Sequence, residues 1–82
     1  MKFYTYILFS ENLNRYYVGS TNEIEDRLER HLVSKKGFTS RAKDWKLKYH
    51  EEYSTRSLAI KREMGIKRWK SRKMIEKLIS EE

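Results

Sequence analysis

The stretch Tyr17-Val-Gly-Ser-Thr-Asn-Glu-Ile-Glu-Asp-Arg-Leu-Glu-Arg-His31 decides how we interpret this chain. It begins as the end of a β-strand, leaves that strand through Gly19, and continues as a helix. Asn22 and Glu25 have the spacing of a capping box, with Asn in place of the usual Ser or Thr. The stretch therefore predicts a strand, a tight turn and a helix that starts just after Asn22.

The predicted helix has an apolar stripe with two polar side chains beside it. The stripe recurs every four residues and indicates the face that packs on the core. Arg27 and His31 are also four residues apart and lie within about 60° of the stripe. We therefore expect both to face the sheet. The stripe consists of Ile24, Leu28 and Leu32, and the residues expected to face water are Glu25, Asp26 and Glu29.

The segment before this stretch predicts an antiparallel hairpin. Residues 2–9 are rich in aromatic and β-branched types and are apolar on both faces, which indicates a central strand. A short run of turn-forming residues leads into a second strand, Arg15 to Gly19. We expect Tyr6 opposite Tyr17 and Tyr4 opposite Gly19, all on one face of the sheet.

The remainder of the chain predicts one strand and two helices. Residues 34–44 lack periodicity and are expected to form a basic loop. Residues 45–53 alternate between apolar and polar types, which predicts a half-exposed strand with His50 at the surface. Ser54 or Thr55 caps a helix that runs to about Trp69, and Ser71 caps a last short helix. The side chains expected to face inward are Leu58, Ala59, Ile66, Trp69, Met74, Ile75, Leu78 and Ile79.

These elements, in the order β-β-α-β-α-α, predict an α+β fold with a small, mainly antiparallel three-stranded sheet flanked by helices. We expect one domain, residues 1–82, because a second core would not fit in this length. The absence of cysteine excludes disulfides and thiolate zinc sites and fits a reducing, cytoplasmic setting. No apolar run approaches the roughly 18–20 residues of a membrane span, and we expect no signal peptide.

The charge is strongly basic and unevenly distributed. Nineteen Lys and Arg against twelve Asp and Glu give a net charge of +7. Residues 1–34 contain four basic and five acidic residues, whereas residues 35–80 contain fifteen basic and five acidic residues. Aromatic residues such as Phe38 and Trp45 are interleaved with the basic ones. This composition favours a polyanion, above all a nucleic acid, although many basic proteins use their charge only for solubility.

Five polar residues have the types that phosphodiester cleavage needs. That reaction requires an activated water, a metal ligand, and positive charge on the phosphate. A carboxylate binds Mg²⁺ or Mn²⁺, Arg pairs with phosphate, and a Tyr hydroxyl near His or a metal can act on the water. These residues are Tyr6 and Tyr17 on the hairpin, Arg27 and His31 on the first helix, and Glu63 on the second.

Over about residues 2–79 the chain resembles the GIY-YIG nucleases. Thr5-Tyr6-Ile7 and Tyr17-Val18-Gly19 are similar to the two short elements that name the family. Arg27, His31 and Glu63 match the family's arginine, its His-or-Tyr position and its metal-binding glutamate. The likeness is strongest to small single-domain proteins similar to the N-terminal nuclease module of the bacterial excision-repair incision subunit.

The resemblance implies a metal-dependent DNA endonuclease of DNA repair or recombination. In it, Glu63 would hold one Mg²⁺ or Mn²⁺, and Arg27 would stabilise the phosphate. Tyr6 and Tyr17 would position or activate the attacking water, with His31 assisting proton transfer. Branched or damaged DNA and RNA all remain open as substrates. We expect the nucleic-acid contacts to come from Lys35, Lys36, Arg41, Lys43 and Arg62.

Two other functions stay open. Ser20 follows Gly19 where the repair nuclease has a Lys, and no Asn follows Asn22, although some members have one after the glutamate. The chain could therefore be a nucleic-acid-binding module with weak or no catalysis, or an interaction domain without a polyanion partner.

Structural roles are also open for the individual residues. Each tyrosine suits a strand, and His31 could be a satisfied core histidine. Arg27 could pair with Glu23, and Glu63 with Lys67, each four residues away.

Overall fold

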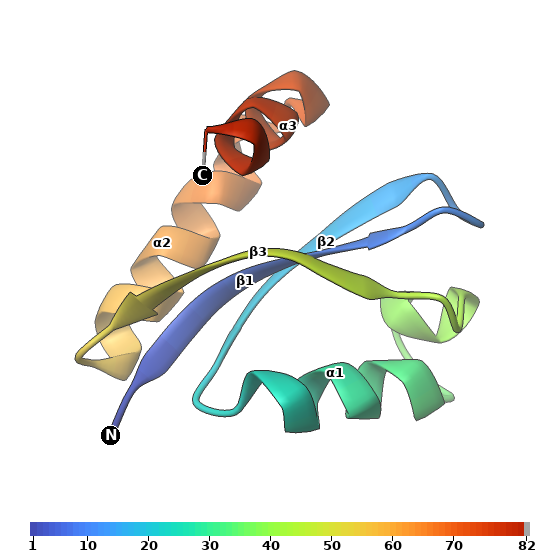
Figure 1. Cartoon of the computed structure of the whole chain (residues 1–82), viewed down its shortest axis with the longest axis horizontal. Helices are drawn as coiled ribbons and strands as arrows, with labels where there is room; N and C mark the ends of the chain where they lie inside the picture. Colours follow the sequence, from blue (N-terminus) through green and yellow to red (C-terminus); the bar gives the residue numbers. More distant parts are fainter. Residues whose placement is uncertain (82) are drawn as a thin grey trace.

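The computed structural model describes residues 1–81 and has the predicted order of elements. The fold is α+β, with three strands and three helices in the order β-β-α-β-α-α. The elements are β1 (Phe3–Ser10), β2 (Arg15–Thr21), α1 (Ile24–Val33), the 3₁₀ helix η1 (Phe38–Arg41), β3 (Lys46–Tyr53), α2 (Arg56–Trp69) and α3 (Arg72–Ser80) (Figure 1).

The sheet is antiparallel throughout, with the strand order β2-β1-β3. The prediction that the first strand is central is therefore confirmed. Helix α1 lies on one side of the sheet, and α2 and α3 lie on the other (Figure 1). The molecule thus has three layers, and β2 and β3 are its two edge strands.

Alternation along β1 divides the core between the two faces of the sheet. Tyr6 and Leu8 pack with Ala42 and Trp45 on the side of α1. Ile7, between them, packs with β2 and with α2 on the opposite face. Because successive side chains of a strand point to opposite faces, one strand supplies both cores.

The predicted hairpin register is wrong by two residues. Tyr6 pairs with Gly19, Leu8 pairs with Tyr17, and Tyr4 pairs with Thr21. A shift of two residues preserves the face of every side chain. Tyr6 and Tyr17 therefore still lie on the same side of the sheet, as predicted.

The turn between β1 and β2 explains the shift, because four residues rather than two connect the strands. Ser10 pairs with Arg15, and Asn14 takes the left-handed conformation at φ 54°. The hydroxyl of Ser10 donates to the Asp44 carboxylate at 2.6 Å, and the same carboxylate accepts from the backbone N–H of Asn12 at 3.0 Å. Asp44, more than thirty positions further along the chain, thus fixes the turn.

The predicted cap of the first helix is also wrong. Strand β2 continues to Thr21, and Glu23 is the N-cap of α1, without a side-chain capping bond. The hydroxyl of Thr21 accepts from the backbone N–H of Glu23 at 3.1 Å. Asn22 lies in the bend that follows the longer strand, one residue before the N-cap, so its side chain does not cap the helix.

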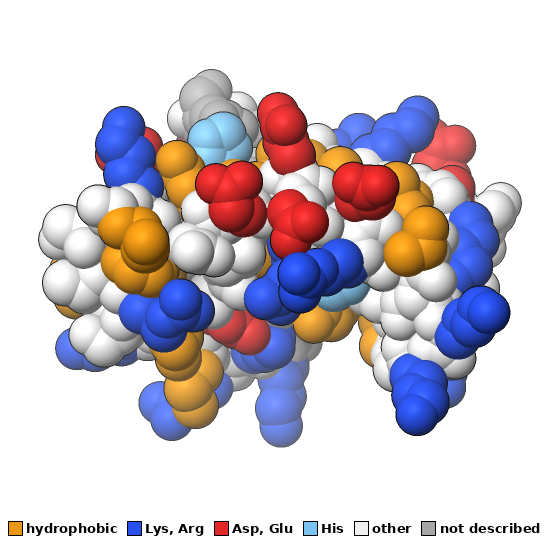
Figure 2. Space-filling model, turned by 90° about the horizontal axis from the view of Figure 1, so that it is seen from below, with side chains coloured by type: hydrophobic (Ala, Val, Ile, Leu, Met, Phe, Trp, Pro, Cys, Tyr) orange, Lys and Arg blue, Asp and Glu red, His pale blue; other side chains and the backbone are white. Residues whose placement is uncertain are grey.

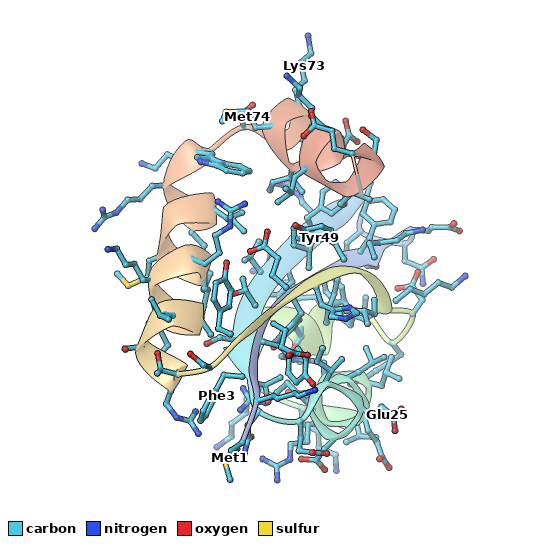
Figure 3. The ribbon with its side chains drawn as sticks, turned by 60° about the vertical axis from the view of Figure 1, so that its left-hand side comes forward. Met1, Phe3, Glu25, Tyr49, Lys73 and Met74 are labelled. Carbon is cyan, nitrogen blue, oxygen red and sulfur yellow. The ribbon has the colours of Figure 1, made fainter. Side chains whose placement is uncertain are left out.

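The caps of the later helices are confirmed, but two predicted core residues are not buried. Thr55 and Ser71 accept from the backbone N–H groups at the starts of α2 and α3. Leu58 and Met74 are 46% and 45% exposed, because their helices pack through neighbouring positions. Met74 lies at the outer side of α3, near the outward-pointing Lys73 (Figure 3).

The predicted loop 34–44 contains a short helix. Gly37, at φ 83°, turns the chain into η1, and the indole N–H of Trp45 donates to the Thr39 carbonyl at 2.9 Å. The third strand accordingly begins at Lys46, one residue later than predicted, and Trp45 is buried. Within residues 1–81, no helix has the length and apolar character that crossing a membrane requires.

Candidate active site

The site forms around Tyr6, where β1, β2 and α1 meet. The hydroxyl of Tyr6 and Nε2 of His31 are hydrogen-bonded at 2.9 Å. The ring of Tyr17 meets the imidazole edge-on, with 4.9 Å between centroids, and lies 6.4 Å from the Tyr6 ring. Three of the five predicted catalytic residues are therefore in mutual contact.

Gly19 is required by the position of Tyr6. A Cβ atom at residue 19 would lie 2.5 Å from the Tyr6 hydroxyl oxygen and 2.7 Å from Cζ. Because real side chains do not approach so closely, the bare backbone of Gly19 is what allows the Tyr6 ring to lie over β2. The glycine therefore serves the site directly.

His31 is buried and has partners on both ring nitrogens. Nδ1 is 3.0 Å from the hydroxyl of Thr39, on η1, and Nε2 bonds Tyr6. Burial, and then the nearby positive charge of Arg27, lower the pKa of His31 below its usual value. The imidazole is consequently neutral at neutral pH and joins Tyr6 and Thr39 in one hydrogen-bonded chain.

Thr39 was not predicted as a site residue. It lies in the basic loop, where no periodic pattern indicates an inward side chain. The nearest signal is Gly37, two residues before it, since a glycine can turn the chain back towards α1. The hydrogen bond from Trp45 to the Thr39 backbone carbonyl then holds that position.

Arg27 lies beside a hollow of ≈ 430 Å³, which we call the Arg27 hollow. The alternative pairing with Glu23 does not occur, and no ion pair of Arg27 is found within residues 1–81. Its guanidinium charge is therefore available to a phosphate. The residues around the hollow are Tyr17, Arg27, Arg30, His31, Ser34, Lys36, Gly37, Phe38 and Thr39.

Glu63 reaches this region from α2, on the other side of the sheet. Its side chain is only 17% exposed, and its Oε2 accepts from Nζ of Lys67 at 2.7 Å. The Lys67 ammonium also lies 5.8 Å from the Tyr17 ring centroid. The simpler alternative, an ion pair at i and i+4, is thus present, but it lies at the edge of the candidate site.

Tyr6 experiences the charges of both helices. Burial is the main cause that raises the pKa of Tyr6 far above its usual value, and Tyr17 and the Glu63 carboxylate raise it further. The positive charge of Arg27 acts in the opposite direction. The two helices therefore converge on this hydroxyl, which stays protonated at neutral pH.

The donor set fits one hard cation. Within the described residues, no three His, Cys, Asp or Glu side chains are grouped as a multi-ligand metal site would need. The carboxylate of Glu63 already attracts a cation, the Lys67 ammonium. A single carboxylate that leaves positions for water and phosphate oxygens suits Mg²⁺ or Mn²⁺.

Four of the five predicted nucleic-acid contacts lie together. Lys35, Lys36, Arg41 and Lys43 are exposed on the segment around η1, next to the Arg27 hollow. Arg62 lies apart from them, since its guanidinium pairs with Glu51 on β3. Figure 2, which looks onto α1 from below, shows acidic side chains in the middle of that face and basic ones around them.

Comparison with known proteins adds the family. The model of the GIY-YIG catalytic domain matches residues 2–77. The chain belongs to the GIY-YIG family. This is a nuclease family whose substrates are nucleic acids and whose members generally use a divalent metal ion.

A solved structure agrees with the GIY-YIG fold. It is the solution NMR structure of a UPF0213 protein from Bacillus halodurans, which is 26% identical to this chain. The match has a TM-score of 0.60 and covers 98% of this chain and 84% of that one. No curated protein sequence is significantly similar to the chain.

Proposed function

We propose that this GIY-YIG domain is a metal-dependent endonuclease that hydrolyses phosphodiester bonds of DNA. The observation that supports it best is the convergence on the Tyr6 hydroxyl of His31, Arg27 and, from the opposite layer, Glu63. Gly19 leaves the room for the Tyr6 ring that places its hydroxyl at His31. A setting in cytoplasmic DNA repair or recombination follows from the likeness to the excision-repair module.

In this proposal Tyr6 and His31 remove the proton of the attacking water. The neutral imidazole accepts at Nε2 from the Tyr6 hydroxyl, while Nδ1–H donates to Thr39. Because the pKa of Tyr6 is raised, a free phenolate is unfavourable. Tyr6 therefore takes the proton of the water as it gives its own to His31, and both transfers occur together.

Tyr17 and Arg27 face the substrate. Both border the Arg27 hollow, whereas Tyr6 lies behind them and is 2% exposed, so the attacking water must enter between Tyr17 and Arg27 to reach the Tyr6 hydroxyl. Tyr17 orients the water, and Arg27 donates to the non-bridging phosphate oxygens as their charge grows. Water oxygen bonds to phosphorus, the bond to the leaving deoxyribose oxygen breaks, and that oxygen takes a proton from solvent.

Glu63 would hold the divalent ion. The chemistry such an ion supplies is neutralisation of phosphate charge and polarisation of the P–O bonds. For this, Lys67 must release the carboxylate, and its flexible side chain can turn to solvent or to a phosphate.

The exposed cations beside the Arg27 hollow hold the DNA backbone. Lys35, Lys36, Arg41 and Lys43 extend from the same side of the molecule as Arg27, so they can contact phosphates that flank the scissile one. Arg62 is outside this contact surface because its guanidinium is used by Glu51.

Nicking of supercoiled plasmid tests the proposal. Wild type should nick the plasmid with Mg²⁺ or Mn²⁺ and stop in EDTA, and Glu63→Ala should be inactive. Glu29→Ala, which removes an exposed carboxylate from α1, is the matched control and should keep full activity. Cleavage by Glu63→Ala at the wild-type rate would refute the metal assignment.

A second function is favoured by one observation, the Lys67 ammonium held on Glu63. If that pair does not open, the domain binds nucleic acid without cleaving it. Salt-sensitive DNA binding by wild type, with no nicking at any Mg²⁺ or Mn²⁺ concentration, would support this alternative.

A further inference from the structure

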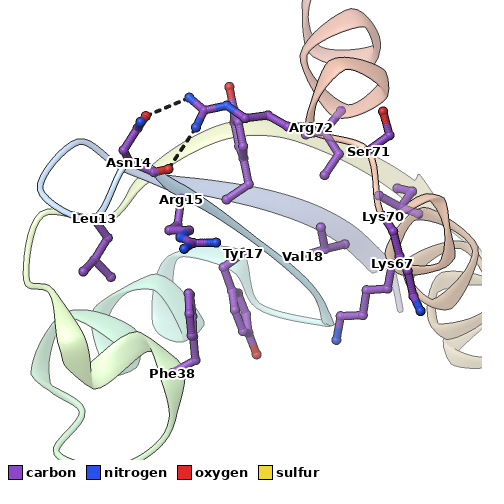
Figure 4. Close-up of a pocket in the computed structure, with 13 residues that line it drawn as sticks. Leu13, Asn14, Arg15, Tyr17, Val18, Phe38, Lys67, Lys70, Ser71 and Arg72 are labelled. Carbon is purple, nitrogen blue, oxygen red and sulfur yellow. Dashed lines mark hydrogen bonds between the residues drawn. The ribbon is translucent and has the colours of Figure 1, made fainter.

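A second hollow, of ≈ 690 Å³, runs along the outer edge of β2 and is larger than the Arg27 hollow. We call it the β2 groove. One wall is Phe38 of η1, and the other comes from α2, α3 and the turn between them (Figure 4). The groove is lined by Leu13 to Val18, Phe38, Ile66, Lys67, Lys70, Ser71, Arg72 and Ile75.

The charged residues of the β2 groove are all basic: Arg15, Lys67, Lys70 and Arg72. Arg72 is already engaged, since its guanidinium bonds Glu76 and the turn residue Asn14 (Figure 4). Within residues 1–81, Arg15 and Lys70 have no ion pair. The groove therefore presents uncompensated positive charge, which favours a polyanion as its occupant.

The groove also presents aromatic and apolar surface. The rings of Tyr17 and Phe38 are nearly parallel, with 15° between planes and 6.4 Å between centroids, and Figure 4 shows them side by side. Val18 and Ile75 add apolar wall. In a duplex the bases are stacked inside, so its backbone would contact only the cations. Unpaired nucleotides expose base faces that stack on such rings.

The β2 groove is continuous with the candidate active site. Tyr17 and Phe38 line both hollows, one on each side of the ring pair. A nucleotide strand that has its scissile phosphate at Arg27 would thus cross these rings and enter the groove. Among residues 1–81, no other residue borders both spaces.

We propose that the β2 groove binds an unpaired nucleotide strand that adjoins the scissile phosphate. The inference rests on the proposed function and names its substrate class: DNA in which a duplex meets a single-stranded segment. An exposed sheet edge could instead pair with an extended peptide. The basic lining without acidic residues, together with the shared aromatic pair, favours the nucleic acid.

Binding in EDTA tests the proposal without cleavage. Fluorescence anisotropy compares a blunt duplex with the same duplex carrying a 5′ or a 3′ single-stranded extension. Wild type should bind one of the extended DNAs at least about fivefold more tightly, the gain expected from stacking a single base. Phe38→Ala and the double variant Arg15→Gln/Lys70→Gln should each abolish this preference.

The matched control is Lys48→Gln/Arg68→Gln, which removes two exposed charges outside both hollows. It should leave the binding of all three DNAs nearly unchanged and keep the preference. Equal binding of blunt and extended DNA by wild type would overturn the proposal and would favour an extended peptide as the occupant of the groove. A preference that survives both groove variants would overturn it as well.

The same DNAs, incubated with Mg²⁺ or Mn²⁺, separate this proposal from the proposed nuclease function. Cleavage with equal binding of all DNAs would mean that the nuclease function holds and the groove inference fails. If the protein prefers the extended DNA through the groove residues but does not cleave it, the groove inference holds and the nuclease function fails.

Discussion

Two clusters in this molecule contain the same side-chain types, namely one glutamate, one arginine and two tyrosines. The first lies at edge strand β3, and we call it the β3 cluster. The second is the candidate active site, where the central strand β1 meets β2 and α1. The β3 cluster consists of Glu51, Arg62, Tyr49 and Tyr53, and its counterparts in the site are Glu63, Arg27, Tyr6 and Tyr17.

The β3 cluster is saturated by its own members. The Glu51 carboxylate accepts from Arg62 at 2.9 and 3.2 Å, from Tyr53 at 2.6 Å, and from Tyr49. Burial and the hydrogen bond to Glu51 raise the pKa of Tyr49 to about 12. Burial alone would raise the pKa of the Glu51 carboxyl. The hydrogen bonds from Arg62 and the two tyrosines outweigh it, so that the pKa is lowered overall. No acceptor capacity remains for a ligand.

The candidate site leaves its groups available. Within residues 1–81, Arg27 has no ion pair and its guanidinium lies against the Tyr6 hydroxyl, whose pKa it acts to lower, while Glu63 has a single partner, Lys67. The two clusters share these four side-chain types. They differ in whether donors and acceptors remain unused, and in the Tyr6–His31–Thr39 hydrogen-bonded chain that belongs to the site. We expect substitutions in the β3 cluster to change stability, and substitutions in the site to change activity.

The largest expected effect is that of Arg27→Gln on cleavage. Removing a charge that stabilises the phosphate in the transition state should lower the nicking rate about 100-fold or more. The free energy of unfolding should change by less than about 0.5 kcal/mol, because Arg27 has no ion pair to lose. Plasmid nicking and urea unfolding measure the two quantities. Arg68→Gln, the same change on the outer face of α2, should alter neither, and a destabilised but active Arg27→Gln would contradict the comparison.

Arg62→Gln should have the opposite profile. It removes two charge-assisted hydrogen bonds to a partly buried carboxylate and a contact with the Trp69 ring. We expect the free energy of unfolding to fall by about 1.5–3 kcal/mol. Nicking by the folded variant, measured well below its melting temperature, should equal that of wild type. A loss of nicking at unchanged stability would place Arg62 in the DNA contact surface instead.

The sequence predicts the layers of this fold because they follow from local pattern. The four-residue spacing of Ile24, Leu28 and Leu32 identifies the buried face of α1, and with it the inward positions of Arg27 and His31. The resemblance to the family then identifies Glu63 as a site residue, because no local pattern links it to α1.

Contacts between distant residues are not predictable in this way. The hairpin register depends on Asp44, which binds the turn from beyond the next helix. Thr39 meets His31 only because η1 folds back over α1, and an aperiodic loop gives no sign of that. The difference between Arg27 and Arg62 is of the same kind, since it depends on whether Glu51 lies within reach.

Gly19→Ala tests the close packing that distinguishes the site from the β3 cluster. The new methyl group would displace the Tyr6 ring and break its bond with His31. We expect a loss of about 1–3 kcal/mol in unfolding free energy, as for other overpacked sites, together with reduced nicking. Gly65→Ala is the matched control, because a Cβ at residue 65 meets no atom within 4 Å. It should stabilise α2 by up to about 1 kcal/mol.

The smallest expected effect is a pH dependence of stability that belongs to the site alone. Because the pKa of His31 is lowered by folding, the unfolded chain binds more protons than the native one below about pH 6.5. Stability should therefore fall as the pH decreases from about 6.5 to about 5, a range above the ordinary pKa of Glu51 and Asp44. Urea midpoints across this range should decline less in His31→Gln, whereas His50→Gln, which changes an exposed ring, should keep the wild-type slope. An identical slope in wild type and His31→Gln would mean that the imidazole is not held neutral, and the proton transfer from Tyr6 would lose its acceptor.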